Sequence, residues 1–396
     1  MAEELTYVLI NPYTLRKSRT GGILSRLLTR TTLDLAAACL FAPSKELVRE
    51  YAETLDHPQS GSGESRSHSR TVRRLIREYV LSNYSPDPVT GRRHRVLMLL
   101  FRGNNAVAKM RECVGDVSHR SVTGETIRDT YGDYIMQDGK VRYFEPAVLT
   151  PQTSRDVPIK LRTWARHSDR DSGLLRNALP YPRTARTQRT LVLIKPDNFT
   201  FPSGKPGNVV DMFSRTGLYI VAFKVQHISV AQAEAFYQPV LPVLLKRFKE
   251  TSGENARRIL SREFGFSMPA STARNLGDLL GPLHARHQFE DIVKFMSGRR
   301  PRECGPSEKK KPGTEKSVVI VYEGEDAVAK VRTVLGPTDP QKAPPGSIRR
   351  EFGQNIMVNA AHASDSPQNA QREMRILNVA KNNLKTIIQE FYGKIR

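Results

Sequence analysis

The feature that most constrains the fold is an internal duplication. The N-terminal half contains TYVLINPY, RVLMLLFRG, NNAVAKMRECVG and GETIRDTYGDYI in this order, and the C-terminal half contains TLVLIKPD, SVVIVYEG, EDAVAKVRTVLG and GSIRREFGQNI in the same order. The tetrapeptide AVAK occurs in both halves, as Ala106–Lys109 and as Ala327–Lys330. Two long copies of one unit indicate a duplicated domain, whereas a solenoid is built from several shorter repeats.

Each copy alternates strands and helices. In the C-terminal copy, short runs of β-forming apolar residues are followed by stretches with apolar residues at helical spacing. The predicted elements are strand Leu191–Lys195, helix Gly207–Arg215, strand Tyr219–Ile228, helix Ser229–Tyr237, strand Val318–Tyr322 and helix Glu325–Leu335. A fourth strand is expected near the segment that precedes Asn359. This order predicts an α/β sandwich, with one sheet covered by helices.

The two copies define the predicted domains. Residues 1–146 form the first domain and residues 189–396 the second. Between them, residues 147–188 are rich in Pro, Arg, Thr and Ser and predict a linker, although Trp164 indicates that part of it docks. The second copy also carries two inserts, at about residues 240–287 and 298–316.

Composition argues against several classes of protein. No run of about 18 apolar residues is present, so no membrane-spanning helix is expected. The first residues lack the basic and apolar regions of a secretory signal. The three cysteines, Cys39, Cys113 and Cys304, are far apart and form no CxxC pair. They indicate a reducing, cytoplasmic compartment and argue against a disulfide framework or a structural zinc site.

The formal net charge of +22 is the unusual bulk property. It predicts an anionic partner, which is a nucleotide, a nucleic acid or a larger acidic assembly. The alternative is a set of solvated basic loops. The basic stretches have no interleaved aromatic residues, so they give no indication of sequence-specific nucleic-acid recognition.

The stretch NAAHASDSPQNAQRE, residues 359–373, contains the candidate nucleophile. Small residues flank His362, and Ser366 followed by Pro367 is typical of a helix start. The N-terminus of such a helix favours anions. Glu373 lies about two turns into the same helix, where it can orient the imidazole. The alternative is an ordinary loop histidine before a capped helix.

Other positions point to phosphate chemistry. Lys195 ends a predicted strand, where charged residues lie beside a cleft and not within the sheet. A long Pro/Gly-rich loop, residues 336–353, is bracketed by Arg332 and Arg349. Arginine binds phosphate through two parallel hydrogen bonds. A nucleophile and a set of cations are the components that phosphoryl transfer requires.

Together these segments resemble the nucleoside diphosphate kinase family. The resemblance rests on RTLVLIKPD, RTGLYIVAFKV, VYEGEDAVAKVRTVLGPTDP, APPGSIRREFG and HASDSPQNAQRE, which occur in the family's order. It covers about residues 189–237, 288–297 and 317–378. It implies two ferredoxin-like βαββαβ domains, each an antiparallel four-stranded sheet covered by helices.

The resemblance also implies a mechanism and a set of residues. In the family, a histidine takes the γ-phosphoryl group of a nucleoside triphosphate and passes it to a nucleoside diphosphate, with Mg²⁺ held by the phosphates and not directly by the protein. His362 resembles the nucleophile, Glu373 its orienting carboxylate and Ser364 the serine beside it. The residues that resemble the family's nucleotide contacts are Lys195, Tyr237, Phe289, Ile292, Arg332, Thr338, Arg349, Ile356 and Asn359.

Two departures from the family pattern stand out. The family's HGSDS is HASDS here, with Ala363 in place of glycine. If that position needs a positive φ, alanine costs about 1 kcal/mol. The usual Phe-Phe pair before the base-lining helix is Gln288-Phe289, which weakens the expected stacking on the nucleobase.

The N-terminal copy lacks the nucleophile. Asn11 replaces the lysine of IKPD, whereas Arg111 and Arg128 remain at the equivalent arginines. Thirteen positions separate Arg349 from His362, and thirteen positions after Arg128 stands Val141. We therefore expect this copy to be catalytically silent.

The leading hypothesis is a tandem protein with a silent first domain and an active second domain. We expect a homo-oligomer in which the two domains of one chain pair with each other. The competing hypothesis is a non-catalytic pseudokinase or scaffold that binds nucleic acid or a partner through its basic surface. The set of six retained residues argues against it: Lys195, Arg332, Arg349, Asn359, His362 and Glu373.

Overall fold

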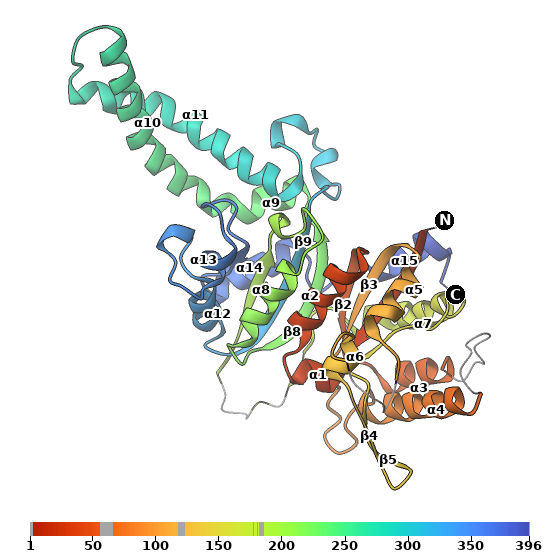
Figure 1. Cartoon of the computed structure of the whole chain (residues 1–396). Helices are drawn as coiled ribbons and strands as arrows, with labels where there is room; N and C mark the ends of the chain where they lie inside the picture. The colour runs from red at the N-terminus through yellow and green to blue at the C-terminus, as the bar shows by residue number, and fades with distance from the viewer. Residues whose placement is uncertain are drawn as a thin grey trace. The chain divides into compact units, whose positions relative to one another are not determined.

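The computed structural model describes residues 3–55, 66–117, 123–176, 178–179, 181 and 186–395. The chain divides into two compact units. One unit comprises residues 1–226 and 318–396 and holds the first repeat and most of the second, and the other comprises residues 227–317. Figure 1 labels the helices and strands of both units.

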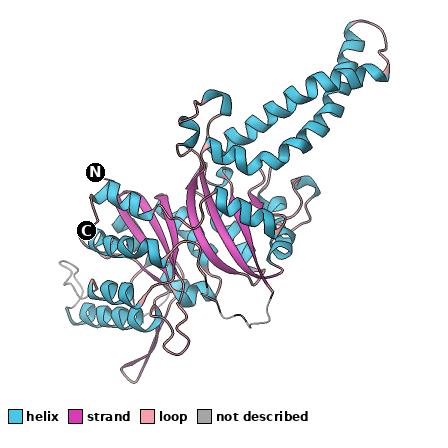
Figure 2. Ribbon diagram, turned by 180° about the vertical axis from the view of Figure 1, so that it is seen from behind, coloured by secondary structure: helices cyan, strands magenta, loops and turns pink. Residues whose placement is uncertain are grey.

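The larger unit is built on one sheet of eight strands (Figure 2). The first repeat contributes β1 (Glu3–Ile10), β2 (Asp34–Phe41), β3 (Val96–Asn104) and β6 (Val148–Leu149), and the second contributes β7 (Thr187–Ile194), β8 (Tyr219–His227), β9 (Lys316–Glu325) and β10 (Ala361–Ala363). The strand order is β10-β7-β9-β8-β2-β3-β1-β6. In each repeat the fourth strand lies beside the first, then come the third and the second, as expected for a ferredoxin-like fold. The predicted fold class is confirmed, with the difference that the two four-stranded sheets are continuous.

The repeats join at their second strands. Strand β2 pairs antiparallel with β8 through Cys39 and Lys224. Helix α2 (Thr20–Thr31) lies against α8 (Lys205–Ser214) so closely that a Cβ atom on Gly21 would stand 2.4 Å from the backbone nitrogen of Asp211. Glycine is therefore required where these two helices meet.

Helices cover both faces of the sheet, because side chains along each strand alternate between the faces. Val8 and Ile10 of β1 pack in one core cluster, and Tyr7 and Leu9 pack in another. The first face carries α2, α5 (Ala106–Val114), α8 and α12 (Ala327–Leu335), and the second carries α3 (Lys45–Glu53), α4 (Arg66–Asn83), α7 (Asp156–Asp171) and α15 (Leu384–Tyr392). Shorter elements are α1 (Pro12–Arg16), α6 (Ile127–Tyr131), the hairpin β4 (Asp133–Gln137) with β5 (Lys140–Glu145), α13 (Ile348–Phe352) and α14 (Pro367–Ile376).

The predicted linker at residues 147–188 is wrong over most of its length. It contains β6, which pairs with β1, and the helix α7. Trp164 of α7 is fully buried, and its ring meets that of Phe41 edge-on at 4.8 Å. The outer face of α7 is rich in charged residues, and this polar composition hid an amphipathic helix that completes the first repeat.

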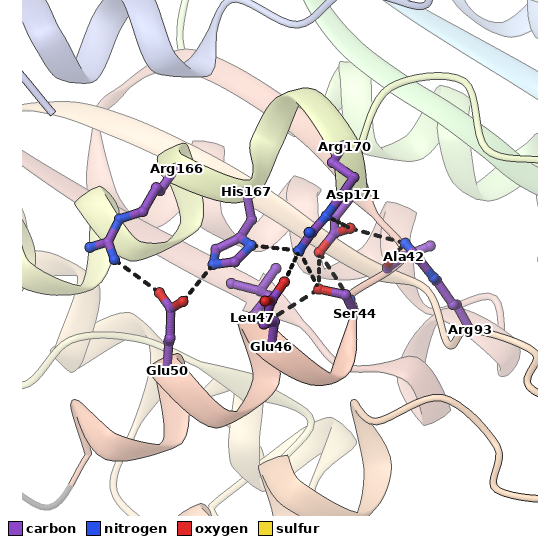
Figure 3. A network of polar contacts seen from close by, with 10 residues as sticks. All are labelled: Ala42, Ser44, Glu46, Leu47, Glu50, Arg93, Arg166, His167, Arg170 and Asp171. Carbon is purple, nitrogen blue, oxygen red and sulfur yellow. Dashed lines mark hydrogen bonds and ion pairs between the residues drawn. The ribbon is translucent and has the colours of Figure 1, made fainter. Parts of the chain in front are cut away.

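A polar network fixes α7 to α3 (Figure 3). The buried carboxylate of Asp171 accepts hydrogen bonds from the backbone nitrogen of Ser44 at 3.0 Å, from its hydroxyl at 2.6 Å and from Arg93 at 3.0 Å. Ser44 is the N-cap of α3, where its side chain accepts from the nitrogen of Leu47. The end of α7 and the start of α3 are thus joined through one buried charge.

The last helix of the chain also packs on the first repeat. Leu384 and Ile388 of α15 are buried in the same core cluster as Trp164. Arg162 of α7 donates to the carbonyl oxygen of Tyr392 at 2.7 Å. The C-terminal segment of the second repeat therefore completes the core of the first.

The smaller unit contains α9 (Val230–Tyr237), the long helices α10 (Leu241–Glu263) and α11 (Ala270–Ser297), and 3₁₀ turns at Pro301–Glu303 and Glu308–Lys310. The insert predicted at 240–287 thus forms most of a helical hairpin. A Cβ atom on Gly253 would lie 2.1 Å from the carbonyl oxygen of Ala273, and one on Gly277 would lie 2.0 Å from that of Lys249. These glycines allow the two helices to approach closely. Among the described helices, none is both long enough and apolar enough to cross a lipid bilayer.

Candidate active site

The site is built where β7 ends beside β10. The backbone nitrogen of Lys195, the residue after β7, donates to the carbonyl oxygen of Ala360 at 3.0 Å. His362 then pairs with Leu193 across the two strands. The predicted fourth strand therefore exists, but it includes the histidine and does not precede the motif.

The backbone strain lies at Ala360 and not at Ala363. Ala360 has a φ of 68°, in the left-handed region that costs an alanine about 1–2 kcal/mol. The side chain of Asn198 donates to its carbonyl oxygen at 2.7 Å and holds this turn. Ala363 belongs to β10 and is not among the residues with positive φ. The condition for a cost of alanine in HASDS, a positive φ at Ala363, is therefore not met.

The imidazole of His362 faces a buried carboxylate. Its Nε2 atom lies 3.1 Å from Oε2 of Glu373, and the hydroxyl of Ser364 donates to the same oxygen at 2.6 Å. Glu373 is on α14, which starts after the predicted N-cap Ser366. An ionised carboxylate only accepts hydrogen bonds, so this arrangement favours the tautomer with the proton on Nε2 and the lone pair on Nδ1.

The amine of Lys195 is held beside the same turn. It donates to Oδ1 of Asn359 at 2.6 Å and to the carbonyl oxygen of Met357 at 2.9 Å. The amide of Asn359 donates in turn to the carbonyl oxygens of Thr338 and Ile356, both at 2.9 Å. Burial lowers the pKa of Lys195 to about 7, and the Arg349 cation acts in the same direction. An anion placed here would favour the charged amine.

Arg349 connects the Pro/Gly-rich loop to β10. Its guanidinium donates to the carbonyl oxygen of Gly336 at 3.0 Å and to that of Ala361, next to the histidine, at 3.2 Å. Arg332 on α12 and Thr338 are exposed, as is the side chain of Ile356. Lys195 and Arg349 thus contact the turn that leads to His362, and Asn359 belongs to this turn.

Three predicted nucleotide contacts lie in the smaller unit. Tyr237 ends α9, and its ring lies 5.0 Å from that of Phe236. Phe289 and Ile292 on α11 are half-buried and pack against a cluster of Leu244, Phe248 and Ala285. Their place relative to His362 stays a prediction.

Sequence comparisons identify the family. Its model, described as nucleoside diphosphate kinase, matches residues 188–241 and 283–382. A nucleoside diphosphate kinase of Anaeromyxobacter sp. (strain Fw109-5) is 34% identical over 188 residues, which are 47% of this chain and 86% of the relative. One of Helicobacter pylori (strain P12) is 34% identical over 187 residues, 47% of this chain and 92% of the relative. The chain belongs to the nucleoside diphosphate kinase family.

Solved structures of the family are also similar to the second half. The nucleoside diphosphate kinase of Aquifex aeolicus is 27% identical, covers 48% of this chain and 94% of its own, and has a TM-score of 0.30. The NDP kinase of Pyrobaculum aerophilum is 26% identical, with coverage of 48% and 94% and a TM-score of 0.30. The predicted enzyme class is thus confirmed at the level of the family by the sequence relatives.

The first repeat shows which residue stands in the place of the histidine. Arg128 donates to the carbonyl oxygens of Gly115 and Val148, as Arg349 does to those of Gly336 and Ala361. Val148 is therefore the counterpart of Ala361, and Leu149 is the counterpart of His362.

The expected counterpart Val141 is wrong. It lies in β5, one strand of the two-stranded sheet β4–β5. The segment from Arg128 to Leu149 spans 21 positions, against 13 from Arg349 to His362, and this hairpin contains the additional residues.

Two tyrosines bind the polar side chains at the equivalent place in the first repeat. Asn11, the counterpart of Lys195, accepts a hydrogen bond from Tyr84 at 2.6 Å and donates to Glu145 at 3.1 Å. Tyr79 donates to the other oxygen of Glu145 at 2.6 Å. All four side chains are buried. The site geometry of the second repeat is thus replaced by a closed internal network.

Sequence reasoning missed Asn198. Its position in the sequence could have identified it, because it directly follows the IKPD motif, three residues after Lys195. In the first repeat a polar residue, Thr14, stands at the same distance from Asn11. Thr14 donates to the carbonyl oxygen of Ala147 at 2.9 Å, as Asn198 does to that of Ala360. Ala147 also has a positive φ, of 58°. Both repeats therefore hold the same strained turn with a polar side chain.

Proposed function

We propose that the second repeat transfers the γ-phosphoryl group of a nucleoside triphosphate to a nucleoside diphosphate through phosphohistidine at His362, and that the first repeat is catalytically silent. The observation that carries this proposal is the chain of contacts from Ser364 to Glu373 to His362. It orients the ring and favours one tautomer, next to a turn that Arg349 and the buried Lys195 contact through hydrogen bonds to Ala361 and Asn359.

In the first half-reaction, the lone pair on Nδ1 of His362 attacks the γ-phosphorus. The bond from that phosphorus to the bridging oxygen breaks, and the nucleoside diphosphate leaves with the electron pair. In the second half-reaction, a terminal oxygen of another nucleoside diphosphate attacks the phosphorus, the P–N bond breaks, and the lone pair returns to Nδ1. Glu373 stabilises the ring as positive charge develops on it.

Cations and polar groups of the second repeat hold the substrate in this proposal. Mg²⁺ enters as part of the nucleotide, bound to its phosphates. Lys195, Arg332, Thr338 and Arg349 contact the phosphates, because guanidinium and ammonium groups stabilise the charge of the transferring group. Tyr237 belongs with these phosphate contacts. Asn359 and Lys195 contact the sugar hydroxyls, and the predicted nucleobase contacts are Phe289, Ile292 and Ile356.

We also propose that the junction of β2 with β8 takes the place of contacts between two separate chains, and that such tandem chains assemble further into a homo-oligomer. The three cysteines are free thiols, which supports a reducing, cytoplasmic compartment.

A labelling experiment tests the catalytic proposal. The full-length chain is incubated with γ-labelled ATP and Mg²⁺, and the protein is analysed for a label that is labile in acid and stable in base. GDP is then added. We expect one labelled histidine per chain and transfer of the label to GDP. The variant His362→Ala should take up no label, whereas His94→Gln, which removes a histidine of the first repeat, should behave as the wild type.

Two results would contradict the proposal. Label retained in His362→Ala would place the nucleophile elsewhere. No label in the intact wild-type protein would favour the non-catalytic scaffold, and nucleic-acid binding that weakens steeply with salt would then be the activity to measure.

A further inference from the structure

A cavity of about 170 Å³ lies at the junction between the two repeats, within the larger unit. It opens beside the contact of α2 with α8, away from the turn that carries His362. The residues that line it include Arg16, Ser18, Thr20, Arg95, Ser214 and Tyr219. The catalytic proposal uses none of them.

The most informative residue of this cavity is Arg95. Its side chain is 9% exposed, and its guanidinium lies over the ring of Tyr219 with the carbon atom 5.3 Å from the ring centre. It donates to the carbonyl oxygen of Ile220 at 2.6 Å. Within the described part of the chain, this is its one hydrogen bond, although a guanidinium has five N–H donors. A buried cation with open donors calls for an anionic partner.

The protein provides little negative charge at this place. Burial lowers the pKa of Arg95 to about 10, and nearby Tyr219, Tyr181 and Glu323 oppose this shift. Glu323 is already paired with Arg189, whose Nε atom lies 2.5 Å from its carboxylate. The second cation of the cavity, Arg16, is exposed. The balance of charge in the cavity is therefore positive.

The size and the lining select the ligand. Pockets for drug-sized molecules measure roughly 300–1,000 Å³, so a cavity of about 170 Å³ is suited to a smaller group. The hydroxyls of Ser18 and Thr20 supply neutral hydrogen-bonding groups, whereas the hydroxyl of Ser214 already donates to the carbonyl oxygen of Asp211. Arginine together with hydroxyls is the set that proteins use for tetrahedral oxyanions.

We propose that this cavity is a binding site for a phosphate group, either free inorganic phosphate or the phosphate of a small phosphorylated metabolite. Arg95 is its buried ligand, and Arg16 closes the site from the solvent side. Arg16 and Arg95 come from the first repeat, and Tyr219 and Ile220, which contact Arg95, come from the second, so the bound anion lies at the junction of the two repeats.

The test uses the full-length chain and inorganic phosphate. Thermal unfolding is followed against phosphate concentration at constant ionic strength, and affinity is measured by calorimetry. Both are done in a Lys195→Met background, which weakens phosphate binding at the proposed catalytic site, and a small phosphate monoester is compared in parallel. We expect phosphate to raise the unfolding temperature, as a ligand specific to the folded state does.

The variants make the test decisive. Arg95→Lys keeps the charge but loses the planar fork, and should weaken phosphate binding on the order of tenfold. Arg16→Gln, which changes an exposed residue, should weaken it several-fold without loss of folding. Arg142→Gln, an exposed arginine on β5, is the matched control and should have no effect.

Equal phosphate shifts in wild type, Arg95→Lys and Arg16→Gln would overturn the proposal, as would the absence of any shift in the wild type. Tighter binding of the monoester would assign the site to a phosphorylated metabolite, and tighter binding of free phosphate would assign it to the inorganic ion. Loss of histidine labelling bears on the catalytic proposal alone.

Discussion

Replacement of Glu373 by glutamine tests how the imidazole is controlled. The carboxylate of Glu373 accepts from Ser364 at 2.6 Å and lies 3.1 Å from Nε2 of His362. Glutamine has the same shape but carries an amide. If its NH₂ group faces the ring, Nε2 must accept a hydrogen bond, and the proton moves to Nδ1, the atom that is proposed to attack phosphorus.

The magnitude follows from the kind of hydrogen bond that is lost. A hydrogen bond to a charged group contributes roughly 1.5–3 kcal/mol. Each 1.36 kcal/mol of barrier is about tenfold in rate, so the loss corresponds to a rate lower by about 10- to 150-fold. The effect should fall on the rate of histidine phosphorylation, because the contacts proposed for nucleotide binding come from other residues. The KM for ATP should change little.

Rapid-quench measurement of labelled protein gives this rate directly. The matched control is Glu145→Gln in the first repeat, which changes a carboxylate that is also buried and accepts hydrogen bonds from Asn11, Tyr79 and the backbone nitrogen of Ala147. That variant should label at the wild-type rate. A Glu373→Gln variant that folds normally and labels as fast as the wild type would refute the orienting role of the carboxylate.

Three further predictions concern charge and backbone. In the folded protein the pKa of Lys195 is lowered from 10.5 to about 7. Between pH 7 and pH 10.5 the unfolded chain therefore binds more protons than the folded one. The stability that this group contributes rises with pH across that window and is lowest below pH 7. Nucleotide binding at pH 8 should therefore take up about one proton, seen by calorimetry in two buffers and lost in Lys195→Met. Asp171→Asn should lower the free energy of unfolding by about 1.5–3 kcal/mol in denaturant titrations, whereas the exposed Asp169→Asn should stay within about 0.5 kcal/mol. Ala360→Gly should raise that free energy by about 0.5–1 kcal/mol without loss of transfer, and a decrease would show that the left-handed turn is not strained.

The sequence predicted the parts of the site that depend on local pattern. The strand before Lys195 and the capped helix after Ser366 followed from periodicity and capping residues, and both are confirmed. The catalytic silence of the first repeat stays a prediction. The motif also predicted that Glu373, about two turns into this helix, orients His362, and the two side chains are in contact. These features are encoded by residues close to one another in the chain.

The errors arose where distant parts of the chain decide the structure. Counting thirteen residues from Arg128 led to Val141, because the count did not allow for the β4–β5 hairpin inserted in the first repeat. The counterpart of His362 is Leu149. The charged outer face of α7 concealed the burial of Trp164. The strained residue was Ala360 and not Ala363, because the strand pairing of β10, and not the motif, sets the backbone angles.

Helix α15 has a consequence for how this chain is made. Leu384 and Ile388 lie in the core of a repeat whose first strand starts at residue 3. The first repeat cannot complete its core during synthesis until residues near 390 have been added. A fragment cut at the boundary between the repeats would expose this apolar face and should aggregate. The duplicated sequence segment and the segment that folds as a unit therefore differ in this protein.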